Sequence, residues 1–229
     1  MMTLHQAGLS DLGDRFRAFI EDKQFPCVGA KSALSRGTME VLLAKDIRSN
    51  WDDRTIYERL TAVVGAYRED RALFRSFAVI FEGPCELSEH DFESFLWARA
   101  ESLTNKDTWL GKPHDDRVSD DPNDPHFSLS FDGEAFFIVG LHPAASRPAR
   151  RFERPVLVFN LHDQFEQLRE QGKYERMREK IIERDVALAG DANPMLARHG
   201  EISEARQYSG RLVSESDWLC PFHPVERPR

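Results

Sequence analysis

Hydrophobic residues recur along this chain with two spacings, and each spacing predicts a different kind of element. In residues 51–69, Ile56, Leu60 and Val63 lie three or four positions apart, which is typical of an amphipathic helix. Residues 76–83, SFAVIFEG, are almost continuously apolar, as in a buried strand. The same reasoning predicts helices over 11–22, 51–69 and 88–104, strands over 38–45, 76–83 and 154–160, a β-hairpin around Asp132-Gly133, and one or two helices within 162–190.

The order of these elements predicts the fold class. Helices alternate with strands in the first half, and a hairpin and further helices follow, which favours a mixed α/β or α+β fold. We expect a central sheet, mostly antiparallel or mixed, with helices packed on it. No internal repeat or low-complexity linker is visible, so residues 1–229 are expected to form a single domain.

Residues 105–126 interrupt the pattern with a polar, Asp-rich segment containing three prolines. A loop of this length within a compact domain is usually functional or mobile. Its carboxylates and its two histidines, His114 and His126, offer ligands for a divalent metal, but their spacing matches no calcium loop. A solvated acidic loop is the alternative that composition favours.

Charge and cysteine content limit the partners and the compartment. The net charge of −8 argues against general binding to nucleic acid or anionic lipid, and no apolar run is long enough to span a bilayer. Three widely spaced cysteines fit a reducing, cytoplasmic setting. Cys27 stands where a helix N-terminus would lower its thiol pKa, although it and Cys220 are also compatible with buried, unreactive cysteines. The common signatures of nucleotide-binding proteins, esterases and zinc proteases are absent.

The stretch GLHPAASRPARRFERP, residues 140–155, sets strong positive charge beside the apolar run AFFIVGL. His142 precedes a proline, which holds it in an extended conformation at the end of a predicted strand. Four arginines follow it: Arg147, Arg150, Arg151 and Arg154. A cofactor with an apolar plane and anionic groups, such as haem, would match this chemistry, because imidazole binds iron and arginine binds carboxylates. A basic loop that neutralises acidic neighbours is the alternative.

Several motifs together resemble one known family. They are FPCVGAKSAL near the N-terminus, the run from FFIVGLHPAASRPARRFERP through FNLHDQFE to KIIERD, and the tail motifs NPML, GEISEARQYSGR and WLCPF. This combination, which spans residues 25–223, closely resembles the YqcI/YcgG family. That family includes haem-dependent enzymes that hydroxylate a nitrogen of guanidino compounds.

The resemblance implies a haem b site, with His142 as the iron ligand and Arg147, Arg150 and Arg151 as partners of the propionates. His162, in the FNLHDQFE motif, is implied as a rival ligand or a catalytic group of the distal pocket. Cys220 is a third choice for the iron.

The same resemblance implies catalytic roles in the tail. Glu204, with Glu201 as a neighbouring alternative, would bind a guanidinium, and Tyr208 would donate a proton. As residues of a polar surface loop they would have no special role.

The expected function is therefore that of a cytoplasmic haem-dependent monooxygenase that N-hydroxylates a small guanidino or amine substrate. Because no flavin or iron–sulfur motif is visible, its electrons would come from an external reductase or from peroxide. We expect neither nucleic acid nor membrane as a partner, and a homodimer is compatible with the sequence. The alternative is a haem-binding protein that senses a gas or carries haem without turnover.

Overall fold

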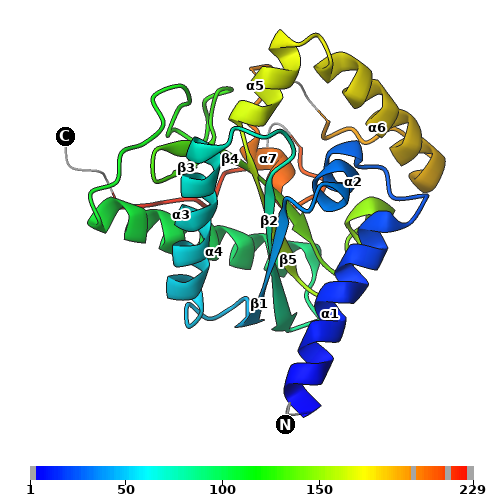
Figure 1. The fold of residues 1–229 in the computed structure, drawn as a ribbon, viewed down its shortest axis with the longest axis horizontal. Coiled ribbons are helices and arrows are strands. Elements are labelled where there is room, and N and C mark those ends of the chain that lie inside the picture. The colour runs from blue at the N-terminus through cyan, green and yellow to red at the C-terminus, as the bar shows by residue number, and fades with distance from the viewer. Residues whose placement is uncertain (1–3, 197–199, 215–217, 226–229) are drawn as a thin grey trace.

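A computed structural model describes residues 4–196, 200–214 and 218–225 (Figure 1). Its elements are, in chain order, α1 (Leu4–Glu21), α2 (Val28–Ser35), β1 (Met39–Asp46), α3 (Asp53–Glu69), β2 (Ser76–Gly83), α4 (Glu89–Trp109), β3 (Leu129–Phe131), β4 (Glu134–Leu141), the short 3₁₀ helix η1 (Pro148–Arg150), β5 (Val156–Leu161), α5 (Asp163–Glu170), α6 (Tyr174–Ala189) and α7 (Ala205–Tyr208).

The five strands form one mixed sheet in the order β1-β2-β5-β4-β3. β1 and β2 are parallel, and α3 makes the crossover between them, whereas all other neighbouring pairs are antiparallel. The mixed α+β fold expected from the sequence is thereby confirmed. None of the helices in the described part of the chain combines the length and apolar character needed to span a bilayer.

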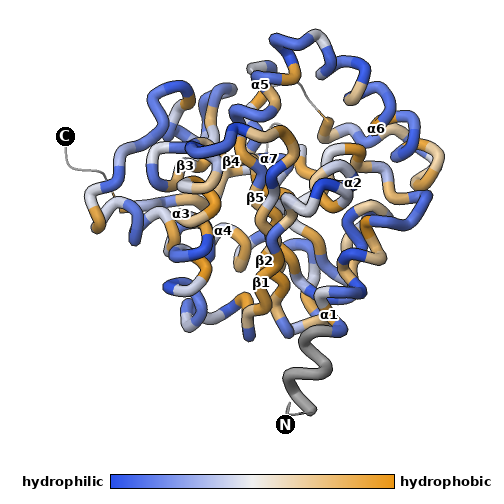
Figure 2. Tube along the Cα trace, in the orientation of Figure 1, coloured by the Kyte–Doolittle hydropathy of each residue, from blue (hydrophilic) through white to orange (hydrophobic). Residues whose placement is uncertain are grey.

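Strand β2 divides the interior into two clusters. Its first six residues are buried, and side chains point alternately to the two faces of the sheet. Phe77 and Val79 join a large cluster with residues of α3 and α4, and we call this side the filled face. Ala78 and Ile80 join a smaller cluster with residues of α1 and α2, on the side that we call the cavity face. Figure 2 shows the apolar segments concentrated along these central strands.

Local signals explain most element boundaries. Ser88 begins α4 as predicted, because its hydroxyl accepts the backbone N–H of Asp91. The β3–β4 hairpin turns at Asp132 and Gly133, whose φ values of 50° and 77° match the turn that Asp-Gly favours. The predicted end of α4 was wrong: the helix continues to Trp109, so the Asp-rich loop begins about one helical turn later than expected.

Candidate functional site

A cavity of about 300 Å³ lies on the cavity face of the sheet. Its floor comes from the sheet, where Met39, Val139 and Val158 belong to three different strands. Its walls come from α1, α2, η1, α5, α6 and the segment around α7. The volume and the mainly apolar lining are typical of sites for cofactors and small molecules.

Helix α6 closes one side of this cavity. Tyr174, Met177 and Ile181 recur at helical spacing, line the cavity and remain only partly buried. The helix ends at Gly190, which has a left-handed φ of 87° and donates its N–H to the carbonyl of Val186. The apolar face that the sequence predicts for α6 therefore covers a cavity and not a packed core.

Arg147 holds α6 against η1. Its guanidinium donates to the carboxylates of Asp185, in α6, and Asp191, just beyond it, and also to the main-chain carbonyl of Asp191. Arg147 is 6% exposed and lines the cavity. A ligand would have to compete with two carboxylates for these donors.

Arg150 joins two segments far apart in the sequence. It donates to the carbonyl oxygens of Gly140, Gln207 and Tyr208 at 3.1, 3.0 and 3.0 Å. Burial lowers its pKa to about 10, so the group still carries its charge at neutral pH. Gly210 allows the close approach, because a Cβ there would lie 3.0 Å from Cδ of Arg150. The two motifs HPAASRPAR and SEARQYSGR thus meet through this one guanidinium.

Among the described residues, the side chain of Arg151 bonds within its own loop, where it donates to the carbonyls of Ala145 and Ser146 at 3.0 and 3.1 Å. It is not among the residues that line the cavity. Of the three arginines predicted to bind propionates, two therefore reach the cavity, and all three contact acceptors of the protein itself.

His142 lies on the opposite side of the sheet from the cavity. It is 1% exposed, and its ring stacks on Phe92 of α4 at a centroid distance of 4.3 Å. Burial lowers its pKa to about 4, which keeps the imidazole neutral. Its Nδ1 has no hydrogen-bond partner among the described residues. The structure thus places His142, the predicted iron ligand, away from this cavity.

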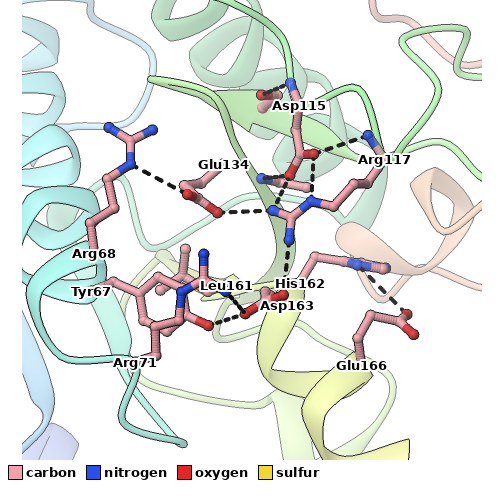
Figure 3. A network of polar contacts seen from close by, with 12 residues as sticks. Tyr67, Arg68, Arg71, Asp115, Arg117, Glu134, Leu161, His162, Asp163 and Glu166 are labelled. Atoms are coloured by element: carbon pink, nitrogen blue, oxygen red, sulfur yellow. Dashed lines mark hydrogen bonds and ion pairs between the residues drawn. The ribbon is translucent and has the colours of Figure 1, made fainter. Parts of the chain in front are cut away.

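His162 and Glu204, two of the predicted catalytic residues, lie next to each other. His162 Nε2 is 3.7 Å from Oε1 of Glu204, and its Nδ1 is 4.0 Å from Oε1 of Glu166. Glu204 lines the cavity and is 7% exposed, whereas the Glu166 side chain is 45% exposed. Figure 3 shows His162 and Glu166 pointing toward each other. The His162 imidazole therefore lies between the solvent-facing carboxylate of Glu166 and the carboxylate of Glu204 in the cavity wall. Glu201, the alternative to Glu204, is exposed.

Tyr208 and Cys220 belong to the filled face. The Tyr208 hydroxyl donates to the carbonyl of Phe136 at 3.2 Å, its ring stacks on Trp97, and burial raises its pKa. Burial likewise raises the pKa of Cys220 to about 12. The cavity walls do not include these two residues, predicted as proton donor and third-choice iron ligand.

Cys27 is the cysteine that lines the cavity. It caps the N-terminus of α2, where its Sγ accepts the N–H of Ala30 at 3.4 Å. Burial raises the pKa of the thiol, and the N–H groups of Ala30 and Gly29 and the charge of Arg150 act in the opposite direction. The sequence indicated the helix N-terminus, but the dominant effect of burial was not visible in it.

The Asp-rich loop contributes to an ion-pair network at the end of the sheet. Arg117 contacts the carboxylates of Asp115, Glu134 and Asp163 at 2.7, 2.9 and 2.8 Å, as Figure 3 shows. The hydroxyl of Tyr67 donates to the same Asp163. Among the described residues, no group of three or more His, Cys, Asp or Glu side chains is arranged to hold a metal ion.

Comparisons with known proteins identify the family of this chain. The model of the YqcI/YcgG family matches residues 16–223. The uncharacterized proteins YcgG and YqcI of Bacillus subtilis (strain 168) are each 26% identical to the chain, over 209 and 213 residues. These alignments cover 86% and 88% of this chain and 80% and 82% of the relatives. No solved structure matches. Because the family model covers nearly the whole sequence, the chain belongs to the YqcI/YcgG family.

Proposed function

We propose that this protein is a haem-dependent monooxygenase that hydroxylates a nitrogen of a small guanidino or amine substrate. The observation that supports the proposal most is the cavity beneath α6, which combines apolar walls, a cysteine sulfur and fixed positive charge. Haem combines an apolar plane, an iron that a cysteine thiolate can bind, and two carboxylates, and these three properties of the cavity match it.

The donor chemistry of the cavity favours Cys27 over His142 as the iron ligand. Its sulfur belongs to the cavity wall and accepts a main-chain N–H, and hydrogen bonds to a thiolate sulfur tune its electron donation. Burial keeps the free thiol protonated, but coordination to a metal deprotonates a thiol outright. Haem, when bound, would supply the iron that activates O2, because no amino-acid side chain performs that chemistry.

Glu204 is suited to bind the cationic substrate. Its carboxylate lines the cavity, and a buried carboxylate pairs strongly with a guanidinium, which offers two parallel N–H donors.

His162 would supply protons beside that anchor. Its two ring nitrogens lie 3.7 and 4.0 Å from carboxylate oxygens of Glu204 and Glu166, so a small movement of either side chain would bring a proton donor and an acceptor within hydrogen-bond distance. The reaction needs such a supply: one oxygen atom of O2 enters the N–H bond of the substrate, and the other leaves as water with two protons and two electrons. An external reductase would deliver the electrons.

Titration of the purified protein with hemin tests this proposal. We expect a one-to-one complex with a Soret band, and a ferrous carbonyl spectrum of the thiolate type. Cys27→Ala should abolish the thiolate signature, while Cys85→Ala, a matched change outside the cavity lining, should leave it intact.

His142→Ala provides the decisive comparison, because it tests the ligand that the sequence suggested. If His142→Ala removes the iron ligation and Cys27→Ala does not, the assignment to Cys27 is wrong. If the wild-type protein binds no hemin, the proposed function fails as a whole. Product analysis with O2, a reductant and a panel of guanidines then separates catalysis, which Glu204→Gln should impair, from haem binding alone.

A further inference from the structure

The cavity lining carries more positive than negative charge, although the whole chain has a net charge of −8. Four arginines line it, Arg147, Arg150, Arg169 and Arg178, against two carboxylates, Asp185 and Glu204. The lining includes neither lysine nor histidine. Two further carboxylates outside the lining, Asp191 and Glu166, pair with Arg147 and Arg169. Partners within the protein therefore offset this charge, and the bonding of each arginine decides which of them can bind an anionic ligand.

Two of these arginines have a structural explanation that needs no ligand. Arg147 contacts Asp185 and Asp191 and thereby holds α6 in place. Arg150 contacts three main-chain carbonyls and joins the loop after β4 to the segment around α7. Most of their donors are engaged by the fold itself, with Nε of Arg147 as an exception among the described residues, which makes them poorer candidates for ligand recognition.

Arg169 and Arg178 differ from them in position and in bonding. They come from α5 and α6, and both are only partly buried. Arg169 donates to Glu166 and lies over the ring of Tyr174, with its Cζ 4.4 Å from the ring centroid. Arg178 donates to the carbonyl of Leu196 at 3.1 Å. These are their hydrogen bonds within the described part of the chain, and each guanidinium has five N–H donors. Arg169 is thus ion-paired with one carboxylate, whereas Arg178 bonds to one main-chain carbonyl, and each guanidinium keeps N–H groups that these contacts do not use.

We propose that Arg169 and Arg178 form the anion subsite of the cavity and bind the two carboxylates of a ligand whose apolar body lies against the sheet. The assignment rests on the proposed function, in which that ligand is haem and the carboxylates are its propionates. It replaces Arg147, Arg150 and Arg151, which the sequence motif suggested for this role.

Hemin and hemin dimethyl ester form a matched pair of probes. Both have the iron and the apolar plane, but the ester lacks the two negative charges. We expect Arg169→Gln and Arg178→Gln each to weaken hemin binding on the order of tenfold, the value of one charge-assisted hydrogen bond. Binding of the ester should be weaker than that of hemin in the wild type and unchanged by either substitution. Arg176→Gln, an exposed position on α6 outside the lining, is the control and should bind hemin normally.

The outcomes separate this subsite from the proposed function. Normal hemin affinity in both variants, or an equal loss for hemin and ester, would overturn the subsite and leave the haem proposal standing. If the wild type binds no hemin, the haem proposal fails, and anilinonaphthalene sulfonate, a fluorescent apolar anion, tests the subsite without haem. Weaker binding of this probe to both variants would support an anion subsite for another ligand. Unchanged or absent binding would overturn it.

Discussion

The two faces of the sheet differ in how completely they are packed, although the same strands supply both. On the filled face, α3 and α4 press aromatic and aliphatic side chains into a continuous core that includes Trp97, Tyr67 and Phe159, each no more than 1% exposed. On the cavity face, α1 and α2 build a smaller cluster, and α6 covers open space. The filled face stabilises the fold, and the cavity face offers room for a ligand. The apolar residues of the two faces therefore serve different purposes.

Two isoleucines on opposite faces give the largest expected contrast. Ile138 in β4 is fully buried in the filled face, so Ile138→Ala should lower the free energy of unfolding by about 3 kcal/mol. Ile181 in α6 is only partly buried above the cavity, and Ile181→Ala should lower it by roughly 1 kcal/mol. Urea denaturation measures both. Equal losses would mean that α6 packs as tightly as the core.

Two glycines sharpen the comparison by adding a methyl group. At Gly140 a Cβ would lie 2.7 Å from a ring carbon of Phe92 and 2.9 Å from Leu96, so Gly140→Ala should cost about 2 kcal/mol. Gly65, within α3, has no atom within 4 Å of such a Cβ. Gly65→Ala should therefore stabilise the helix by about 0.5–1 kcal/mol. Thermal unfolding measures whether each substitution raises or lowers the stability. An increase in stability for Gly140→Ala would contradict tight packing around Gly140.

The filled face should also weaken in mild acid through His142. Its pKa is about 4 in the fold and near its ordinary value of about 6.5 in the unfolded chain, because burial disfavours the charged ring. The unfolded state therefore binds a proton first as the pH falls, and folding loses about 2 kcal/mol between pH 7 and pH 5. Glu89 opposes this shift and Arg150 adds to it.

Urea denaturation of the wild type and of His142→Phe at both pH values isolates this contribution. The phenylalanine preserves ring stacking on Phe92 but cannot titrate. Between pH 7 and pH 5, the free energy of unfolding of the wild type should fall by about 2 kcal/mol more than that of His142→Phe. Identical pH dependence would show that His142 is not the group responsible.

Most of the helices and strands could be predicted from the hydrophobic pattern, because a long segment with regular apolar spacing is compatible with one kind of element. The helices at 51–69 and after Ser88 and the hairpin at Asp132-Gly133 were found close to their true positions. The end of α4 was missed because a polar helix face and a polar loop have similar composition. Helix α2 was not assigned as an element, since eight residues provide too few periods to recognise.

The site was less accessible to sequence reasoning because it depends on which face each residue occupies. Side chains alternate along a strand, so Val139 and Leu141 point to the cavity while Gly140 and His142 point away. If the alternation is continued one residue past the end of β4, it predicts that His142 faces away from the cavity. The arginines between 147 and 151 carry no such pattern, because their partners lie in α6 and in the tail, far away in the sequence. Cys27 had the signal of a helix N-terminus, but that signal does not distinguish a cavity wall from a packed core. Arg169 and Arg178 had no signal that separated them from surface residues.

The guanidinium of Arg150 has a consequence for how this chain can change over evolutionary time. Its acceptors at Gln207 and Tyr208 are main-chain oxygens, which every amino acid possesses. The contacts of Arg150 therefore set no requirement on the side chains at those two positions. Position 150 requires arginine, and position 210 favours glycine because its φ is 84° and a Cβ would lie 3.0 Å from Cδ of Arg150. Across divergent relatives, the pair that should remain invariant is an arginine and a glycine sixty positions apart.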